Sequence, residues 1–192
     1  MKRGILASRD ELASLRGRIH QKPFDAFYDA LAKRCALILE STPVTEMQWQ
    51  SAWASGRQNA ALTAARGAQG RILDLVIADA IDTNSAYRSR AVEELMNLAH
   101  WSTWIDPSRA DLELNLCTAE AAFAATIGLD WLWEFLSETQ RQIVIEALCR
   151  RVIEPYVKSV EKEIWWYSAV NHWNAVMNSA CGLAGLALSE EN

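Results

Sequence analysis

The sequence predicts an all-α protein. The helix-favouring residues Ala, Leu, Glu and Arg are abundant, whereas the 192 residues include only 4 Pro and 8 Gly. Apolar residues recur every three or four positions, and the strict alternation of apolar and polar residues that is typical of a half-buried strand is absent. The length fits one domain with a sizeable core, so we expect residues 1–192 to form a single helical domain.

Local signals give the order of the helices. Ser8 is a good N-cap for a short first helix, and Ser137, with Gln140 at the capping-box position, marks the start of a later one. The remaining periodicities predict helices over residues 23–40, 45–54, 58–81, 84–104, 118–135, 139–159 and 173–188. Because long helices joined by short turns have antiparallel neighbours, we expect a stack of helical hairpins.

Two pairs of glycines lie inside predicted helices. Gly67 and Gly70 belong to the Ala-rich helix, and Gly182 and Gly185 belong to the last one. Because glycine has no side chain, it lets another backbone approach closely. We therefore expect tight helix contacts at both pairs.

Charge and composition exclude several classes of function. The net charge is −5, and Lys and Arg are scattered along the chain, which argues against a nucleic-acid partner. No apolar run approaches the length of a membrane span, so we expect no membrane partner. The chain is then either cytosolic or the product of signal-peptide removal.

Common cofactor and metal motifs are also absent. Cys35, Cys117, Cys149 and Cys181 are far apart in the sequence, which predicts buried free thiols rather than a zinc site. The sequence has no serine-nucleophile elbow, Gly-rich phosphate loop or His-Glu-x-x-His motif. We therefore expect neither a metal nor a cofactor.

Polar and aromatic side chains concentrate in residues 165–180, which hold three Trp, one Tyr, three Asn and one His. Asn171, Asn174 and Asn178 are spaced i, i+3, i+7 and share one face at the start of the last predicted helix. A helix N-terminus favours an anionic ligand. His172 points elsewhere on an ideal helix, but it joins Asn171 and Asn174 in one site if it belongs to the preceding loop.

A structural interpretation of the same side chains stays open. Asn171 is also a suitable helix cap, and Asn174 and Asn178 are able to bond to each other or to nearby loops. A lone histidine such as His172 is more often a structural residue than a catalytic one. The residue types alone do not decide between these interpretations.

Most of the nine Trp fall near the ends of predicted helices, where loops and clefts form. Aromatic rings fill protein cores, and their faces also suit sugar rings. The clustering favours a groove that stacks sugars. We expect this groove to be lined by Trp165, Trp166, Tyr167 and Trp173 and bordered by His100 and Trp104.

Six segments carry a family resemblance through their order and spacing. They are Asp111-Leu-Glu-Leu-Asn-Leu-Cys-Thr-Ala-Glu120, Gly128-Leu-Asp-Trp-Leu-Trp133, Leu136-Ser-Glu-Thr-Gln-Arg141, Glu154-Pro-Tyr156, Trp165-Trp166 and Asn171-His-Trp-Asn-Ala-Val176. Together they resemble the N-terminal helical domain of the heparinase II/III-like and alginate-lyase-like polysaccharide lyases. Residues 5–16 are similar to the opening helix of that domain.

The resemblance implies an incomplete (α/α) toroid, in which helical hairpins form an arc around a cleft. Complete family members continue with more hairpins and with antiparallel β-sheet domains, and they cleave uronic-acid polysaccharides by β-elimination. In that reaction an Asn, His or Arg binds the uronate carboxylate and lowers the pKa of the C5 proton. A Tyr or His then removes the proton, and a Tyr protonates the leaving oxygen.

Carried onto this sequence, the resemblance gives the carboxylate-binding role to Asn171, His172 and Asn174, with Asn178 as a further substrate contact. The family's catalytic Tyr lies on a later hairpin, and Tyr167 does not occupy that position. Because the chain ends at Asn192, we expect it to hold acidic polysaccharide, such as alginate or a heparin-like glycan, without cleaving it alone. The parent protein would be periplasmic or secreted.

The alternative is a non-catalytic helical module that binds glycans or docks a partner protein. A toroid that stops early bares apolar surface along its open edge. Because exposed apolar surface drives association, self-association through that edge is part of this alternative.

Overall fold

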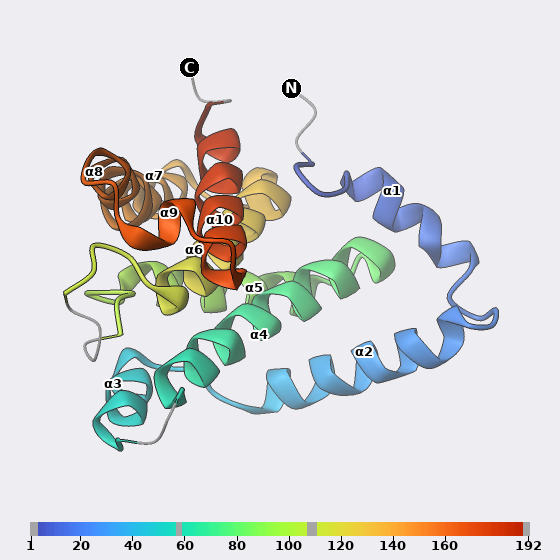
Figure 1. Cartoon of the computed structure of the whole chain (residues 1–192). Coiled ribbons are helices and arrows are strands. Elements are labelled where there is room, and N and C mark those ends of the chain that lie inside the picture. Colours follow the sequence, from blue (N-terminus) through green and yellow to red (C-terminus); the bar gives the residue numbers. More distant parts are fainter. Residues whose placement is uncertain (1–3, 57–58, 107–110, 190–192) are drawn as a thin grey trace.

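The computed structural model describes residues 4–56, 59–106 and 111–189, apart from the side chains of Arg9 and Trp53. Within these ranges the chain has helices and no strand, which confirms the all-α prediction. The helices are α1 (Arg9–Ser14), α2 (Phe24–Glu40), α3 (Glu46–Ala54), α4 (Ala60–Asp82), α5 (Ser85–His100), α6 (Leu116–Leu132), α7 (Glu138–Leu148), α8 (Glu154–Glu161), α9 (Trp165–Ser168) and α10 (His172–Ser189). Figure 1 shows α10 crossing in front of α6.

The predicted N-caps are confirmed. The hydroxyl of Ser8 accepts a hydrogen bond from the backbone N–H of Glu11 at 3.2 Å, and the hydroxyl of Ser137 accepts one from Gln140 at 3.2 Å. The predicted helices match α2, α3, α4, α6 and α10 to within a few residues at each end. Residue 58, the predicted start of α4, lies outside the described residues.

The helix predicted over 84–104 ends early, at His100. Trp101 leaves the helix with a φ of −56° and a ψ of 138°. The indole N–H of Trp104 then donates to the carbonyl of Leu98 at 3.1 Å. The turn therefore satisfies one of the carbonyls left free at the end of α5.

The helix predicted over 139–159 is divided by a π-helical turn, Cys149–Ile153, between α7 and α8. Pro155 follows this turn and lies in the first turn of α8. Proline has no N–H, and its ring clashes with the carbonyl four residues earlier, which here belongs to Arg151. The wider turn accommodates the ring, which explains the interruption.

Helix α6 is the centre of the fold. It packs against α4, α5, α7 and α10, and it is buried on every side from Cys117 to Leu132, with Phe123 and Glu120 as its half-buried exceptions within that stretch. A helix that is apolar all round has to be covered all round. The four neighbouring helices provide that cover.

One close helix contact involves a glycine, but not one of the predicted pairs. A Cβ added at Gly128 would lie 2.9 Å from Cδ1 of Leu95, so α5 and α6 approach closely there. A Cβ would meet only one methyl group, at 3.9 Å, at Gly67, and nothing within 4 Å at Gly70, Gly182 and Gly185. The prediction of tight contacts at those pairs is wrong, because the glycines lie on flanks of α4 and α10 that face away from neighbouring helices.

A buried ion network joins α4 to α5. Oε1 of Glu94 accepts from Nε of Arg71 at 2.8 Å and from Nε of Arg90 at 2.9 Å, and the Glu94 side chain is 1% exposed. The same two guanidinium groups donate to the carbonyls of Thr42 and Ser41. The network therefore also fixes the loop between α2 and α3.

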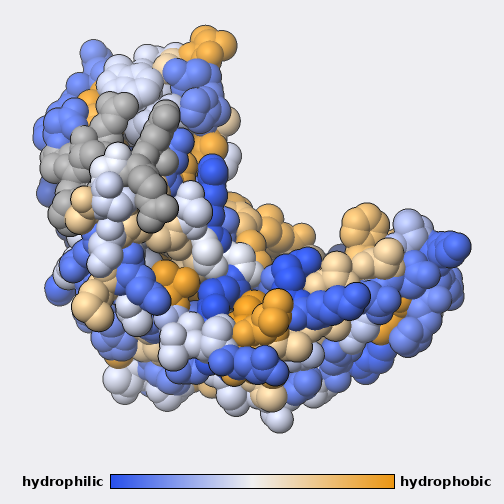
Figure 2. All heavy atoms as spheres, turned by 90° about the horizontal axis from the view of Figure 1, so that it is seen from below, coloured by the Kyte–Doolittle hydropathy of each residue, from blue (hydrophilic) through white to orange (hydrophobic). Residues whose placement is uncertain are grey.

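The surface of the molecule is hollowed on one side. Seen from below, the molecule has two arms that meet at an angle, and apolar residues lie among polar ones on the surface between them (Figure 2). None of the described helices is long and apolar enough to cross a membrane.

Replacing Glu94 with Ala should lower the free energy of unfolding by about 3–5 kcal/mol, because two guanidinium groups would lose the buried carboxylate that they share. The neighbouring Glu93 is the control: its side chain is 56% exposed and lies 3.5 Å from Arg90. Glu93→Ala should cost less than about 1 kcal/mol. Urea unfolding measures both, and equal losses would contradict the network.

Candidate functional site

The start of α10 and the single turn α9 bring together most of the predicted site. Glu163 has a left-handed φ of 48°, and Ile164 is extended, so the chain turns sharply after α8. Helix α9 then packs against α10. This arrangement places side chains from both helices on one exposed part of the surface.

Trp165 and Trp173 form an aromatic pair on this surface. Their ring centroids are 5.3 Å apart, and their planes are inclined by 52°. Trp165 is 47% exposed, whereas Trp173 packs partly against the core. Tyr167 is also exposed, and its ring packs edge-on against the ring of the buried Trp166, with the two ring centroids 6.5 Å apart. The aromatic pair therefore presents an apolar face to solvent from a fixed support.

Asn171 caps α10. Its Oδ1 accepts a hydrogen bond from the backbone N–H of Trp173 at 3.0 Å, which satisfies one of the free N–H groups at the helix start. The side chain is otherwise exposed. Its amide nitrogen has no bond to any residue that the structure describes, so it remains available to a ligand.

Asn174 and Asn178 hold α10 to its neighbours. The amide Nδ2 of Asn174 donates to the carbonyl of Tyr167, and Oδ1 of Asn178 accepts from the hydroxyl of Tyr156 at 2.9 Å. Burial raises the pKa of the Tyr156 hydroxyl, which keeps it protonated as a donor. Both amides thus have structural bonds, as the alternative interpretation of the sequence proposed.

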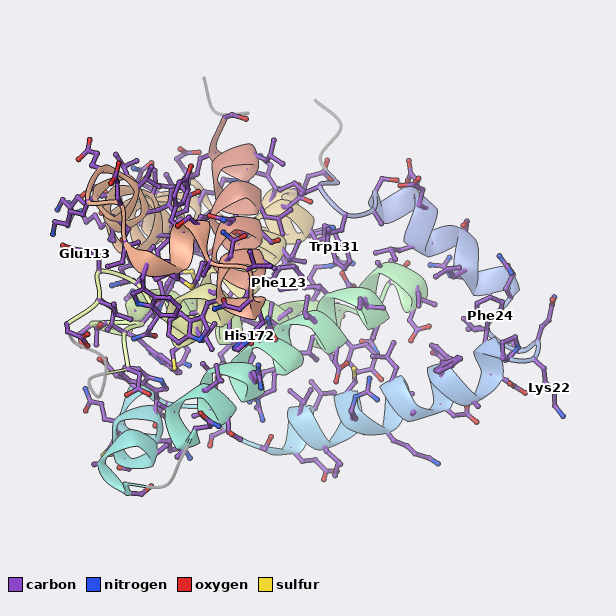
Figure 3. The ribbon with its side chains drawn as sticks, viewed as in Figure 1. Lys22, Phe24, Glu113, Phe123, Trp131 and His172 are labelled. Carbon is purple, nitrogen blue, oxygen red and sulfur yellow. The ribbon has the colours of Figure 1, made fainter. Side chains whose placement is uncertain are left out.

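His172 lies on the other flank of α10. It is the first residue of the helix, its side chain is exposed, and it makes no hydrogen bond with the described residues. Positions 172, 176, 179 and 183 follow helical spacing, so His172 shares a face with Val176 and Ser179 rather than with Asn174. Figure 3 draws His172 at the lower end of α10, with Phe123 labelled just above it in that view.

That face borders a groove between α4, α6 and α10, with a volume of about 350 Å³. Its apolar lining consists of Ala119, Phe123, Ala175, Val176, Ala180 and Leu183. Three polar side chains complete it, namely Gln69, Glu120 and Ser179. We call this cavity the α4–α6–α10 groove.

One of the residues that line this groove, Glu120, forms an ion pair. Nε of Arg66, on α4, donates to Oε1 of Glu120, on α6, at 2.8 Å. The Arg66 side chain is 60% exposed, and that of Glu120 is 14% exposed. The groove therefore carries a solvent-accessible guanidinium beside its apolar floor.

The other predicted site residues lie apart from this surface or beneath it. Trp166 and Trp104 are 0% and 1% exposed, so they pack in the core and do not line a surface groove. His100 is exposed at the end of α5, where its Nδ1 lies 2.6 Å from the carbonyl of Met96. Of the predicted groove-lining tryptophans, Trp165 and Trp173 reach the surface.

The cysteines are unpaired thiols, as predicted, and Cys35, Cys117 and Cys181 are buried, whereas Cys149 is half-buried, so the predicted burial is wrong for Cys149. Burial raises the pKa of each of these three thiols to about 12, which keeps them protonated and unreactive. Across the described ranges, no group of three or more His, Cys, Asp or Glu side chains is placed to hold a metal ion.

Sequence reasoning missed the groove residues Gln69, Phe123 and Ser179, and it missed Arg66, which pairs with the groove residue Glu120. They come from three helices, and Arg66 is 54 residues from its partner Glu120, so no local pattern connects them. One local pattern did indicate part of the groove. A single helix face of mixed polarity is formed by His172, Val176 and Ser179, which are spaced i, i+4, i+7.

Comparisons with known proteins add no further assignment. No family model matches the chain, and no curated protein is similar to it. The functional assignment therefore depends on the residues and their geometry.

Replacing Asn171 with Ala should lower the free energy of unfolding by about 1 kcal/mol, because α10 loses its capping oxygen. Asn171→Asp keeps an oxygen at the same place and adds a charge that the helix N-terminus favours, so it should restore wild-type stability. Thermal or urea unfolding measures both variants. Equal stability of the Ala and Asp variants would contradict the capping role.

Proposed function

We propose that this chain is the substrate-holding helical part of a polysaccharide lyase that acts on uronic-acid polysaccharide. The observation that carries the proposal is the aromatic pair of the exposed Trp165 and the half-buried Trp173 at the start of α10, where His172 is also exposed. Aromatic faces bind the apolar faces of sugar rings, and a cationic or hydrogen-bonding group beside them reads the carboxylate.

The helix arrangement is compatible with an (α/α) toroid. Helix α6 contacts both α4 and α10, and α5 contacts α7. Alternation of helices between two layers is what a stack of helical hairpins produces. We therefore propose that α4, α6 and α10 belong to the inner layer, which borders the sugar-binding side, and that the parent protein is periplasmic or secreted.

The three residues of the predicted carboxylate clamp would then have different roles. Asn171 has a free amide nitrogen, which is able to donate to a carboxylate, and His172 is able to do the same from its imidazole. Asn174 uses its nitrogen on Tyr167, so only its oxygen remains, and this suits a sugar hydroxyl better than a carboxylate. Binding the carboxylate would acidify the C5 proton. We assign proton transfer to no residue of this chain.

Oligouronates should bind the chain, and Trp165→Ala should weaken that binding about two- to tenfold, because one stacked ring contributes about 0.5–1.5 kcal/mol. Isothermal titration calorimetry measures the affinity. Phe27→Ala is the matched control, since Phe27 is a 71% exposed aromatic residue on α2. The proposal fails if wild-type protein binds no oligouronate, or if the two variants lose the same affinity.

The second candidate is a module that associates with a second copy of itself, without sugar. It is favoured by exposed apolar side chains on α2, where Phe27 is 71% exposed and Leu37 is 66% exposed. Under this hypothesis, the wild-type chain is a dimer in light scattering, and the double variant Phe27→Ser, Leu37→Ser is a monomer. A wild-type monomer at millimolar concentration would exclude this candidate.

A further inference from the structure

We propose that the α4–α6–α10 groove is a subsite for one uronate ring, with Arg66 as the residue that binds its carboxylate. This inference rests on the proposed function, because it takes the same oligouronate as ligand. It adds a second contact region and a specificity-determining residue that the sequence motifs did not include.

The groove has the composition of a pyranose site. A ring of this kind has an apolar face and a rim of hydroxyl groups, and Phe123 supplies an aromatic surface among the aliphatic side chains of the floor. Gln69 and Ser179 are able to exchange hydrogen bonds with the hydroxyls, and Glu120 is able to accept from them. A volume of about 350 Å³ lies within the range of small-ligand sites.

Arg66 differs from the other ion-paired arginines of the described surface. It makes one hydrogen bond, from Nε to Glu120, and neither of its terminal nitrogens bonds to a described residue. Arg34, by contrast, donates from Nε and from Nη2 to both oxygens of Asp74, at 2.7 and 2.8 Å. The terminal edge of Arg66 is therefore free for a bidentate contact with a carboxylate.

The ion pair with Glu120 restricts the orientation of the Arg66 guanidinium and therefore of its terminal nitrogens. Because Nε is held by the Glu120 carboxylate, which lines the groove and is 14% exposed, the guanidinium is fixed next to a groove residue while the Arg66 side chain stays 60% exposed. A bound uronate would place Arg66 between two carboxylates, one from the protein and one from the ligand. The negative charge of Glu120 opposes the ligand, so its removal should strengthen uronate binding.

The groove continues toward the proposed carboxylate-binding residue of α10. Val176 and Ser179 line it and share a helix face with His172. A chain of sugars that contacts His172 would therefore have its next ring at the groove. This continuity favours an oligouronate over an isolated small molecule as the occupant.

Arg66→Gln should weaken binding of a tetrameric oligouronate about tenfold and leave binding of its carboxyl-reduced analogue unchanged, measured by calorimetry. Arg34→Gln is the matched control, because Arg34 is a 54% exposed, ion-paired arginine on α2, and it should bind both ligands like wild type. Glu120→Gln should strengthen uronate binding about threefold. Unchanged thermal unfolding midpoints would show that all three variants are folded.

The outcomes separate this inference from the proposed function. If wild-type protein binds the oligouronate and Trp165→Ala weakens it while Arg66→Gln does not, the groove assignment is overturned and the proposed function stands. If Arg66→Gln weakens binding of the charged ligand and of the carboxyl-reduced ligand equally, the assignment of Arg66 as the residue that binds the carboxylate is overturned. If the wild-type chain binds neither ligand, both proposals are overturned.

Discussion

Helix α6 is buried around almost its whole circumference, and the other helices are arranged to cover it. Burying a helix removes water from both of its ends, where the free N–H and C=O groups then need partners. At the N-terminal end, Asn115 accepts from the N–H of Cys117 at 3.1 Å, and Thr118 donates to the carbonyl of Trp104 at 3.2 Å. Near the other end, the buried Asp130 accepts from the N–H groups of residues 4 and 5. The N-terminal segment is thereby tied to the central helix.

The same constraint explains why a groove forms beside α6. Close packing around a buried helix needs short side chains, and α6 and α10 both supply alanines at their contact. At the groove, Ala119, Ala175 and Ala180 are too short to fill the space between the two helices, and Gln69 of α4 lines the third side. The groove is thus a consequence of the small residues that let α10 pack against α6.

Much of the fold could be predicted from the sequence, because it depends on local signals. Periodicity gave the helices, and Ser8 and Ser137 gave two of their starts. The site was harder to predict. Asn171 and Asn174 were correctly placed at the start of α10, but whether an amide caps a helix or faces a ligand depends on neighbours such as Tyr167. The pairing of Arg66 with Glu120 depends on tertiary packing, which no local pattern encodes.

The difference between Trp165 and Trp166 supports a role for the aromatic pair in binding. Adjacent in sequence, they have opposite environments, since Trp166 is 0% exposed and Trp165 is 47% exposed. An aromatic side chain buries about 150–250 Å² when it is covered, so half of that area corresponds to about 2–3 kcal/mol of hydrophobic stabilisation at about 25 cal/mol per Å². Folding gains the hydrophobic stabilisation of the whole Trp166 side chain, but it gains only about half of that stabilisation for Trp165. A ligand that stacks on one face of the exposed ring recovers part of the remaining stabilisation, and Trp173 holds the ring in a fixed orientation before the ligand arrives.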